Sequence, residues 1–534
     1  MKLAEVSENK RSILRGSFGS AAATLLARIL GLVRVQLEAG ILGGGALATI
    51  WQTAFMVPNL FRRLFGEGAL SQALIPILSH TEAEKGLAEV RKQLAVVLSG
   101  LTALLIVLTI LVSAGGLAIG NFCPVPGYVK SAMSILPMLM PYAIFICLVG
   151  VMTAVVNTRK VFFLASLNAL ILNVVMIALL CLAGKFSYGS NSKLIYILIG
   201  GVLISGVLQM LLLMWLLKRY GVFPVFQKSS TPAKNIFGEL WTLALPGLIG
   251  GGATQISFLI DRSIALKLGD YAVPALNYTE RLVYLPVGIV AVALGSVLMA
   301  QMSRAAANKN YDEMMDDMTA GLRYVCFLCI PAAVFMIAYR EPLIKLLFMR
   351  GRFTEVDAAN TADALFYYAM GIPLFCSLKV ILPGFYARKD MKTPLKISLV
   401  CIFLNIPLSI ALMYPLKQGG IALATVIAQL VNNVLLVYFL RREKFSPDLE
   451  QLSIAFIRSI FFALLAAFPA LYYLQMTHWT QKISIRALPE LLPLLIGIAS
   501  YAVIYLGLSF LSKASEPREI IQSLLSRKSR KKES

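Results

Sequence analysis

The residues of this chain best suited to do chemistry are charged side chains that lie inside apolar sequence. The segment VPNLFRRLFGEGALSQALIPIL, residues 57–78, places Arg62, Arg63 and Glu67 in a stretch that otherwise suits lipid. A charge at the centre of a membrane helix costs roughly 2.5–3.5 kcal/mol on insertion scales, so such residues usually face a protein interior or a water-filled cavity. We therefore take these three residues as candidates for a functional site.

Further ionisable residues occur in the same kind of sequence. They are Arg28, Arg34 and Glu38 in the first apolar run, Asp261, Arg262 and Lys267 in the seventh, Glu280 and Arg281 at the start of the eighth, and Lys379 in the tenth. Arg34 and Glu38 are spaced to pair on one helix face, and Arg281 has Glu280 and Asp261 as candidate partners. Arg62 and Arg63 are also able to snorkel to the cytoplasmic surface. For any one residue, structural pairing is therefore an alternative to a binding role.

Taken together, the arginines predict an anion site. Arg28 and Arg34 lie about 240° apart around an ideal helix, so both face one cavity only if it is wide or if the helix bends, as Gly31 permits. Arg62 and Arg63 differ by about 100°, so we expect one to reach the interior and the other the interface. Guanidinium groups bind phosphate bidentately, so a cavity lined by them suits a phosphate-containing substrate.

The elements that must position these residues are membrane helices. The chain has 534 residues, 58% of them hydrophobic, and its mean hydropathy is +0.77, which is more apolar surface than a soluble protein can bury. Apolar runs of roughly 20 residues, each long enough to cross about 30 Å of hydrocarbon, recur along the chain. They begin near residues 17, 46, 95, 132, 161, 194, 239, 276, 321, 361, 395, 420, 454 and 488. Because the runs are continuous and do not alternate, we predict an all-α polytopic membrane protein of fourteen transmembrane helices and exclude a β-barrel.

The net charge of +22 follows the predicted topology. With the N-terminus inside, the cytoplasmic segments include KRSILR, EVRK, TRK, ARKDMKTPLK, RREK and the tail SRKSRKK. This is the positive-inside bias of a membrane protein, with some attraction to anionic lipid. Both termini are then cytoplasmic, and the first run is a retained helix because no clear small-residue cleavage site precedes it. The basic residues form no nucleic-acid-binding module, so nucleic acid is not expected as a partner.

Enzymatic chemistry has little support in the sequence. Cys326 and Cys329 form a C-x-x-C inside a predicted span without a second pair, which favours small apolar filler over metal or redox chemistry. No G-x-x-x-x-G-K-[ST] motif for nucleotide binding is present. The acids of DEMMDD, residues 312–317, come nearest to the carboxylate cluster of a membrane glycosyltransferase, but they read more simply as a solvated helix face. We therefore expect a protein that is not an enzyme and holds no cofactor.

The chain shows a hint of internal duplication. ALSQALIPILS at 69–79 aligns with ALGSVLMAQMS at 293–303, about one six-helix half later, as in transporters built from repeats. The pattern predicts two six-helix lobes around a central cavity, followed by a C-terminal helix pair. The expected domains are an N-terminal lobe at 1–236, a C-terminal lobe at 237–445, helices 13 and 14 at 446–512, and a basic cytoplasmic tail at 513–534.

Five blocks of the sequence resemble the MurJ (MviN) family of lipid II flippases, which belongs to the multidrug/oligosaccharidyl-lipid/polysaccharide exporter superfamily. The blocks are ARILGLVR (27–34), VPNLFRRLFGEGALSQALIPIL (57–78), NYTERLVYLPVGIVAVALGSVLMAQMSR (277–304), RGRFT (350–354) and LPGFYARKDMKTPLK (382–396). They follow the family's order and run over nearly the whole chain. The resemblance implies fourteen helices, with the last pair forming a lipid-facing groove.

The resemblance also implies roles for individual residues. Carried over by motif position, the substrate-binding residues are Arg28, Arg34, Arg62 and Arg281, and the gate and signature residues are Asn59, Arg63, Glu67 and Glu280. We further assign Arg62 to the cytoplasmic gate. At two positions where the family usually has acids this chain has Val35 and Thr49, which makes the cavity more positive and removes those acids from an ion relay.

Some family members are thought to bind sodium, and the matching residues here are Asp261, Asn405 and Thr425. Ser409 stands where we would expect a carboxylate. We therefore treat sodium and the membrane potential as two alternative sources of energy for transport.

The function implied is movement of lipid II, the undecaprenyl-diphosphate-linked disaccharide-pentapeptide, from the cytoplasmic to the periplasmic leaflet of the bacterial inner membrane by alternating access. This step serves peptidoglycan biosynthesis and hence cell-wall biogenesis and cell shape. Membrane lipids and proteins of cell-wall synthesis are the other expected partners. The alternatives are a flippase for another polyprenyl-diphosphate-linked oligosaccharide, a polyprenyl-phosphate-using membrane glycosyltransferase, and a non-transporting scaffold.

Overall fold

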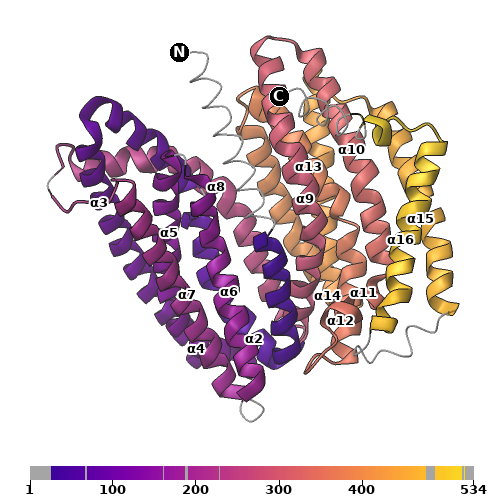
Figure 1. The fold of residues 1–534 in the computed structure, drawn as a ribbon, viewed down its shortest axis with the longest axis horizontal. Coiled ribbons are helices and arrows are strands. Elements are labelled where there is room, and N and C mark those ends of the chain that lie inside the picture. Colours follow the sequence, from indigo (N-terminus) through magenta and orange to yellow (C-terminus); the bar gives the residue numbers. More distant parts are fainter. Residues whose placement is uncertain are drawn as a thin grey trace. The chain divides into compact units, whose positions relative to one another are not determined.

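The computed structural model of the chain is almost entirely helical (Figure 1). It describes residues 26–66, 69–159, 161–186, 191–227, 229–476, 488–519 and 522. No strand occurs among these residues, and several of their helices are long and apolar enough to cross a membrane. The predicted class, an all-α polytopic membrane protein, is confirmed.

The chain divides into two compact units, each described here by itself. Unit 1 comprises Met1–Leu266 and Gly351–Phe353, and unit 2 comprises Lys267–Arg350 and Thr354–Ser534. Helix α8 (Ala233–Ala265) contains the predicted lobe boundary at residue 236. It packs mainly against α3 (Ala69–Phe122) and the turn η1 (Arg62–Gly66) and belongs to unit 1. The functional division into two six-helix lobes and a C-terminal pair stays a prediction.

Unit 1 begins with a helix described over residues 26–42. The elements after it are α2 (Ala46–Phe61), the π-helical turn η1 (Arg62–Gly66), α3 (Ala69–Phe122), α4 (Gly127–Leu139), α5 (Pro141–Thr158), α6 (Phe162–Phe186), α7 (Asn191–Arg219) and α8 (Ala233–Ala265). Unit 2 contains α9 (Ala272–Ala307), α10 (Tyr311–Ala338), α11 (Arg340–Phe348), α12 (Glu355–Ala369), α13 (Ile372–Ala387), α14 (Lys392–Arg442), α15 (Leu449–Met476) and α16 (Leu488–Leu511).

Two of these helices are each a pair of helices joined at one non-helical residue. Gly86 (φ 80°, ψ 172°) interrupts α3, and Lys417 (φ 48°, ψ −130°) interrupts α14. Among the described residues, eight helical segments satisfy the length and hydropathy of a membrane span, and the two longest contain these breaks. The predicted number of fourteen spans stays a prediction.

Aromatic side chains fill the core of unit 1. Trp51 and Tyr142 are among its largest fully buried side chains, and Trp51 stacks on Phe55 with ring centroids 5.3 Å apart. Helix α7 approaches α5 closely at Gly206. A Cβ there would lie 3.0 Å from the Tyr142 ring, so the approach depends on a residue without a side chain. Small residues at such positions let membrane helices pack tightly, since lipid gives them no hydrophobic drive to associate.

In unit 2, the α15–α16 pair packs against α10. Pro331 in α10 has no N–H, so the carbonyl of Phe327, four residues earlier, loses its helical partner. The Tyr505 hydroxyl of α16 donates to that carbonyl at 2.8 Å, and Tyr501 donates to the carbonyl of Pro331 at 2.8 Å. A buried core that includes Tyr339 and Ala466 surrounds these bonds. The sequence thus tolerates a proline inside a membrane helix because a neighbouring helix re-satisfies the backbone.

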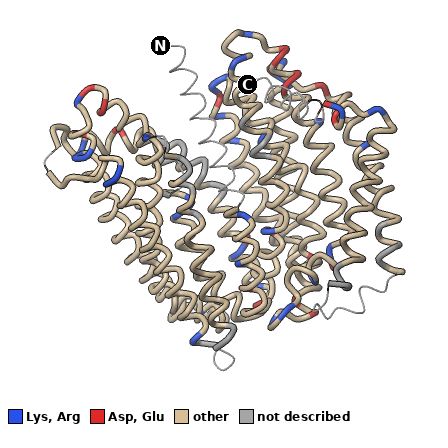
Figure 2. Tube along the Cα trace, viewed as in Figure 1, with Lys and Arg blue, Asp and Glu red and all other residues tan. Residues whose placement is uncertain are grey.

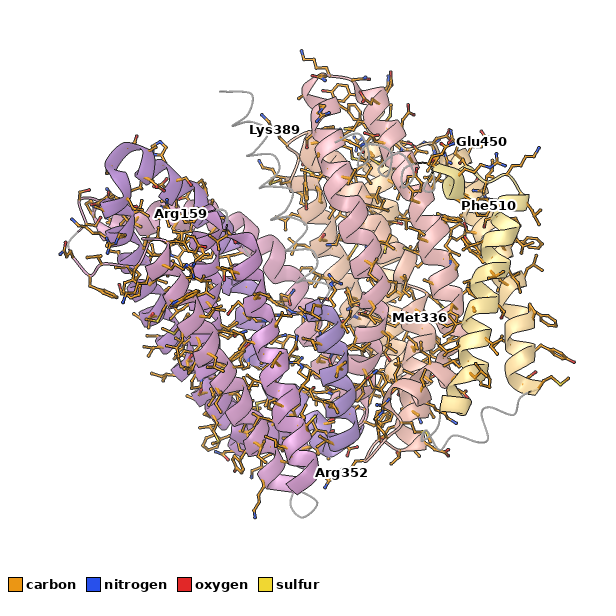
Figure 3. All side chains as sticks on the ribbon, viewed as in Figure 1. Arg159, Met336, Arg352, Lys389, Glu450 and Phe510 are labelled. Carbon is orange, nitrogen blue, oxygen red and sulfur yellow. The ribbon has the colours of Figure 1, made fainter. Side chains whose placement is uncertain are left out.

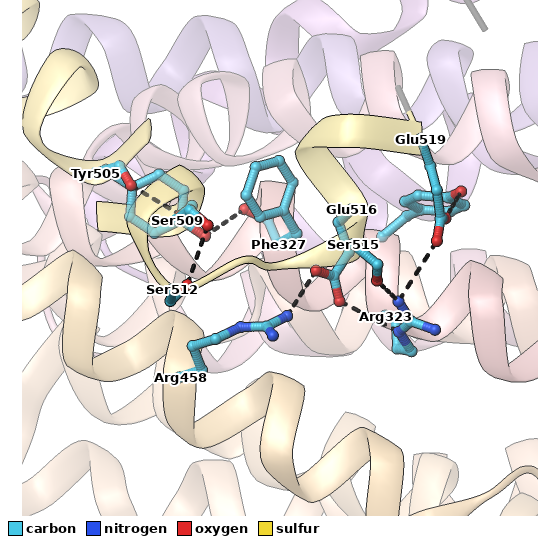
Figure 4. Close-up of polar contacts among 10 residues, drawn as sticks. Arg323, Phe327, Arg458, Tyr505, Ser509, Ser512, Ser515, Glu516 and Glu519 are labelled. Carbon is cyan, nitrogen blue, oxygen red and sulfur yellow. Dashed lines mark hydrogen bonds and ion pairs between the residues drawn. The ribbon is translucent and has the colours of Figure 1, made fainter. Parts of the chain in front are cut away.

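Beyond α16, the chain is fixed to unit 2 by a charged cluster (Figure 4). Glu516 is 1% exposed and accepts from Arg458 Nη2 at 2.6 Å and from Arg323 Nε at 3.2 Å. Ser515 accepts a second bond from Arg323, and the Tyr324 hydroxyl donates to Glu519. The cluster therefore joins α10, α15 and the segment after α16.

Charges elsewhere gather mostly at helix ends, while α15 and α16 are largely uncharged along their middles (Figure 2). At one end of unit 1, Arg159 forms a bidentate ion pair with Glu82, at 2.8 and 2.9 Å (Figure 3). Further along α3, beyond the break at Gly86, buried Glu89 accepts from Ser229 Oγ at 2.6 Å and from the Ser230 N–H at 2.7 Å. The Glu89 contacts hold the loop between α7 and α8 against the polar part of α3.

Candidate functional site

The first helix carries two predicted site arginines, which differ in burial and in ion pairing. Arg34 is 7% exposed, and its Nε lies 3.4 Å from Glu38 Oε1, so the pairing suggested by their spacing is present. Arg28 is half-buried and, within the described part of the chain, has no ion-pair or hydrogen-bond partner. Of these two cations, Arg28 is therefore the one without a charged partner among the described residues.

The glycine between these arginines faces α6 at a distance that an added Cβ would fill without a clash. The helix is continuous over residues 26–42, and a Cβ at Gly31 would lie 3.8 Å from Asn173 Nδ2 on α6. Asn173 Nδ2 also donates to the Ala27 carbonyl at 3.1 Å. Asn173 thus contacts this helix at the turn that carries Arg28, a contact that the sequence alone did not indicate.

The signature segment forms the turn η1 directly after α2. Pro58 lies inside α2, and the backbone then widens into a π-helix from Arg62 to Gly66. π-helical turns are rare and frequently mark functional sites. Asn59 Oδ1 accepts from Arg62 Nε at 2.8 Å, so the signature asparagine orients the signature arginine within one turn. Glu67 lies outside the described residues.

Arg63 points to a different partner. Its Nη1 donates to Gln255 Oε1 of α8 at 3.1 Å, and its Cζ lies 5.6 Å from the centroid of the Phe258 ring. Arg62 and Arg63 therefore contact different groups. That one of them reaches the interior and the other the interface stays a prediction. Neither Gln255 nor Phe258 was singled out from the sequence, although a glutamine in so apolar a run was a usable signal.

The remaining predicted residues belong to α9 and α13 of unit 2. Arg281 is exposed and Glu280 half-buried on α9, and both make polar interactions. Lys379 on α13 is exposed as well. Since Arg28, Arg34 and Arg62 belong to unit 1 and Arg281 to unit 2, their convergence on one cavity stays a prediction.

The predicted sodium ligands are likewise divided. Asp261 on α8 is buried in unit 1, whereas Asn405 and Thr425 lie on α14 in unit 2, where Asn405 is 3% exposed. The Thr425 hydroxyl donates to the Ile421 carbonyl of its own helix at 3.1 Å. Among the described residues no cluster of three or more His, Cys, Asp or Glu side chains is present. The sodium site stays a prediction.

Two substitutions relative to the expected pattern occupy packed positions. Val35 is 5% exposed beside Arg34, and Thr49 is fully buried in α2. An ionised carboxylate at either position would need a partner to offset its desolvation. At these two positions unit 1 therefore has a valine and a threonine, and neither can offset the charge of an arginine.

Comparisons with known proteins agree on one family. A family profile described as "Lipid II flippase MurJ" matches residues 39–491. The chain is 32% identical to the "Probable lipid II flippase MurJ" of Rhizobium meliloti over 422 residues, 78% of each chain. It is also 32% identical to the protein of that name from Vibrio cholerae over 444 residues, 81% of this chain and 83% of the relative.

Solved structures support the same fold. "Lipid II flippase MurJ, inward closed conformation" matches with a TM-score of 0.74 and 24% identity, covering 92% of this chain and 98% of that one. An inward-facing multidrug resistance MATE transporter of the MOP superfamily matches with a TM-score of 0.67 and 14% identity, covering 78% and 94%. The fold is thus shared with transporters of more than one substrate class.

Proposed function

Because the chain belongs to the MurJ family of lipid II flippases, we propose that it moves lipid II from the cytoplasmic to the periplasmic leaflet of a bacterial inner membrane. The observation that carries this proposal is the family match over residues 39–491, which includes the arginine-bearing signature segment. Both termini are then cytoplasmic, and transport feeds peptidoglycan synthesis. The resemblance inferred from the sequence blocks is confirmed at the level of the family.

The physical problem is to carry a diphosphate through hydrocarbon. A charged group that loses water without compensation costs many kcal/mol, and guanidinium groups replace the lost hydration with charge-assisted hydrogen bonds. In our proposal Arg28, Arg62 and Arg281 supply these bonds. Arg34 contributes less net charge than the sequence suggested because Glu38 offsets it.

The polyprenyl tail has a separate route. Helices α15 and α16 pack side by side, and their outer faces carry exposed apolar side chains such as Phe461, Phe468 and Val503. We propose that the tail stays in lipid along this pair while the head group passes through the cavity. Rocking of the lobes then exposes the head group to the other leaflet.

The membrane potential is sufficient to set the direction of substrate transport. Moving one elementary charge is worth about 2.3 kcal/mol per 100 mV, so an inside-negative potential drives an anionic head group outward. It also draws an empty, net-positive carrier back. Sodium bound by Asp261, Asn405 and Thr425 would add a second gradient, and replacing sodium by potassium in a transport assay separates the two sources.

The decisive test is lipid II orientation in cells that depend on this chain. We expect Arg28→Ala to reduce externalised lipid II at least tenfold at unchanged protein level, because Arg28 has no charged partner among the described residues and is assigned to the diphosphate. Arg304→Ala is a matched control, since Arg304 lies in the last turn of α9 among the solvated charges. Externalisation at the wild-type rate in Arg28→Ala would contradict the proposed site, and its absence in the wild-type chain would contradict the function.

A further inference from the structure

A stripe on α8 faces the signature turn η1 and is not explained by the residues assigned so far. Gln255, Phe258 and Arg262 are spaced i, i+3 and i+7, so they share one face of α8. Arg63 of η1 contacts the first two, through Gln255 Oε1 at 3.1 Å and the Phe258 ring at 5.6 Å. The residues in contact are 192 positions apart, so the contact fixes η1 to α8.

The aromatic ring in this stripe is shared by two cations. Arg262 Cζ lies 4.9 Å from the Phe258 centroid, closer than Arg63 Cζ. A ring attracts a cation through its quadrupole, but two guanidinium groups at one ring repel each other. Arg262 is 5% exposed and fixed in the core, whereas Arg63 is half-buried. Arg63 is therefore the cation that an incoming anion can draw away.

The partner of Arg63 differs from that of Arg62. Arg62 donates to Asn59, three residues earlier in the chain, at 2.8 Å. Arg63 contacts α8, which ends at Ala265, and six residues separate this end from the start of α9 at Ala272. Helix α9 carries Glu280 and Arg281. The connection along the chain from α8 to α9 is therefore short.

We propose that Gln255 and Phe258 are positioning residues for Arg63, and that a diphosphate bound by Arg63 releases them, so that α8 responds to the substrate. This inference rests on the proposed function for the identity of the anion. The amide oxygen of Gln255 is a neutral acceptor, which orients a guanidinium but binds it less strongly than a doubly charged diphosphate does. Substrate therefore outcompetes Gln255, whereas a carboxylate at position 255 would not yield in the same way.

The experiment is a double-mutant cycle on the full chain. The variants are Gln255→Leu, Arg63→Ala and the combination, with Ser263→Ala as the control. Ser263 is exposed on α8, and its hydroxyl donates to the Leu259 carbonyl of the same helix at 2.9 Å. Leucine has nearly the size of glutamine but accepts no hydrogen bond. The readouts are externalised lipid II per protein in cells and the Tm of the purified chain without substrate.

We expect Gln255→Leu to lower transport three- to tenfold in the wild-type background and less than twofold in Arg63→Ala, while Ser263→Ala changes neither readout. The same factor in both backgrounds would show that Gln255 acts independently of Arg63 and would overturn the proposal. Should Arg63→Ala abolish transport, the Tm cycle decides. A Tm loss from Gln255→Leu that at least halves in Arg63→Ala supports the contact, and an equal loss overturns it.

Gln255→Glu tests release directly. A carboxylate pairs with Arg63 and competes with the diphosphate, so we expect a Tm above wild type and transport at least tenfold lower. Transport equal to that of the wild type would overturn the release step.

A wild-type chain that externalises no lipid II would refute the proposed function and with it the release step. The substrate-free Tm cycle would still test the positioning of Arg63 by Gln255. The two failures are therefore distinguishable.

Discussion

Arg352 donates its backbone N–H to the carbonyl oxygen of Gly40 at 2.7 Å, which fixes residues 351–353 to the end of the first helix of unit 1. The contact needs glycine on both sides. Gly351 has φ +60°, and a Cβ there would lie 2.2 Å from the Gly40 oxygen; Gly43 has φ +76°, and a Cβ there would lie 2.9 Å from the Arg352 oxygen. In unit 1, Arg352 lies at the end opposite Arg159, so the contact belongs to the predicted periplasmic side (Figure 3).

Gly351→Ala should therefore destabilise the chain by more than its backbone conformation alone explains. An L-residue with positive φ costs roughly 1–2 kcal/mol, and displacement of the Gly40 carbonyl adds to this. Gly221→Ala is the matched control, because Gly221 has φ +72° and no atom within 4 Å of the added Cβ. Thermal unfolding of both variants measures the difference, and equal losses of Tm would show that the close approach to Gly40 is immaterial.

Removing the Glu516 carboxylate should loosen the segment after α16. Glu516→Ala leaves Arg323 and Arg458 without their shared partner, and loss of one member of a buried ion pair costs about 3–5 kcal/mol. Glu519→Ala should cost less, about 1 kcal/mol, since Glu519 is half-exposed and loses a 3.8 Å ion pair with Arg323 and the hydrogen bond from the Tyr324 hydroxyl. Limited trypsin digestion at the tail, with thermal unfolding beside it, compares the two. Equal cleavage rates would argue against the anchoring role.

Tyr505→Phe should cost about 1–3 kcal/mol, because the Phe327 carbonyl, already deprived of its helical donor by Pro331, would be left unsatisfied. Tyr472→Phe is a suitable control on α15, where the side chain is exposed. Thermal unfolding in one detergent measures both variants. A Tyr505→Phe chain as stable as the wild type would mean that another donor reaches Phe327.

The loop between α7 and α8 should detach in acid. Glu89 lies in the polar sequence HTEAEKGLAEVRK, residues 80–92, outside the apolar part of α3. Burial raises the pKa of Glu89, but hydrogen bonds from Ser229, Ser230 and Thr231 outweigh this effect and lower it from 4.5 to about 2.

Because the unfolded chain binds this proton more readily, the contribution to stability is complete above about pH 4.5 and is lost as the pH falls towards 2. Hydrogen exchange of residues 222–231 at stepped pH should show this loss in the wild type. Glu89→Gln removes the titrating group and should flatten the profile over that range. A wild-type profile parallel to that of Glu89→Gln would contradict the assignment.

Local features were readable from the sequence because they depend on spacing along one helix. The i,i+4 spacing of Arg34 and Glu38 predicted their pairing, and the acids of residues 312–317 do form the exposed first turns of α10, with Met314 and Met318 turned inward. Cys329 is buried, as expected for apolar filler. Each of these follows from periodicity in a continuous apolar run.

Long-range contacts were not readable in this way. Nothing local to Arg63 indicates Gln255, and nothing local to RGRFT indicates Gly40, because such contacts depend on how helices pack in three dimensions. The breaks at Gly86 and Lys417, by contrast, fall between predicted apolar runs: Gly86 lies before the run that begins near 95, and Lys417 lies before the run that begins near 420. The predicted convergence of the arginines depends on packing of the same kind.

The π-helical geometry of η1 has a mechanical implication. A π-turn holds one residue more than the α-helical turn it replaces, so its conversion to an α-turn shifts the register of the following residues by about 100°. Such a conversion would swing the Arg63 side chain around the helix axis while the core residues of α2, such as Trp51, kept their places. Through such a change in helix type, the signature segment can turn one guanidinium in a new direction while the packing of the surrounding helices stays the same.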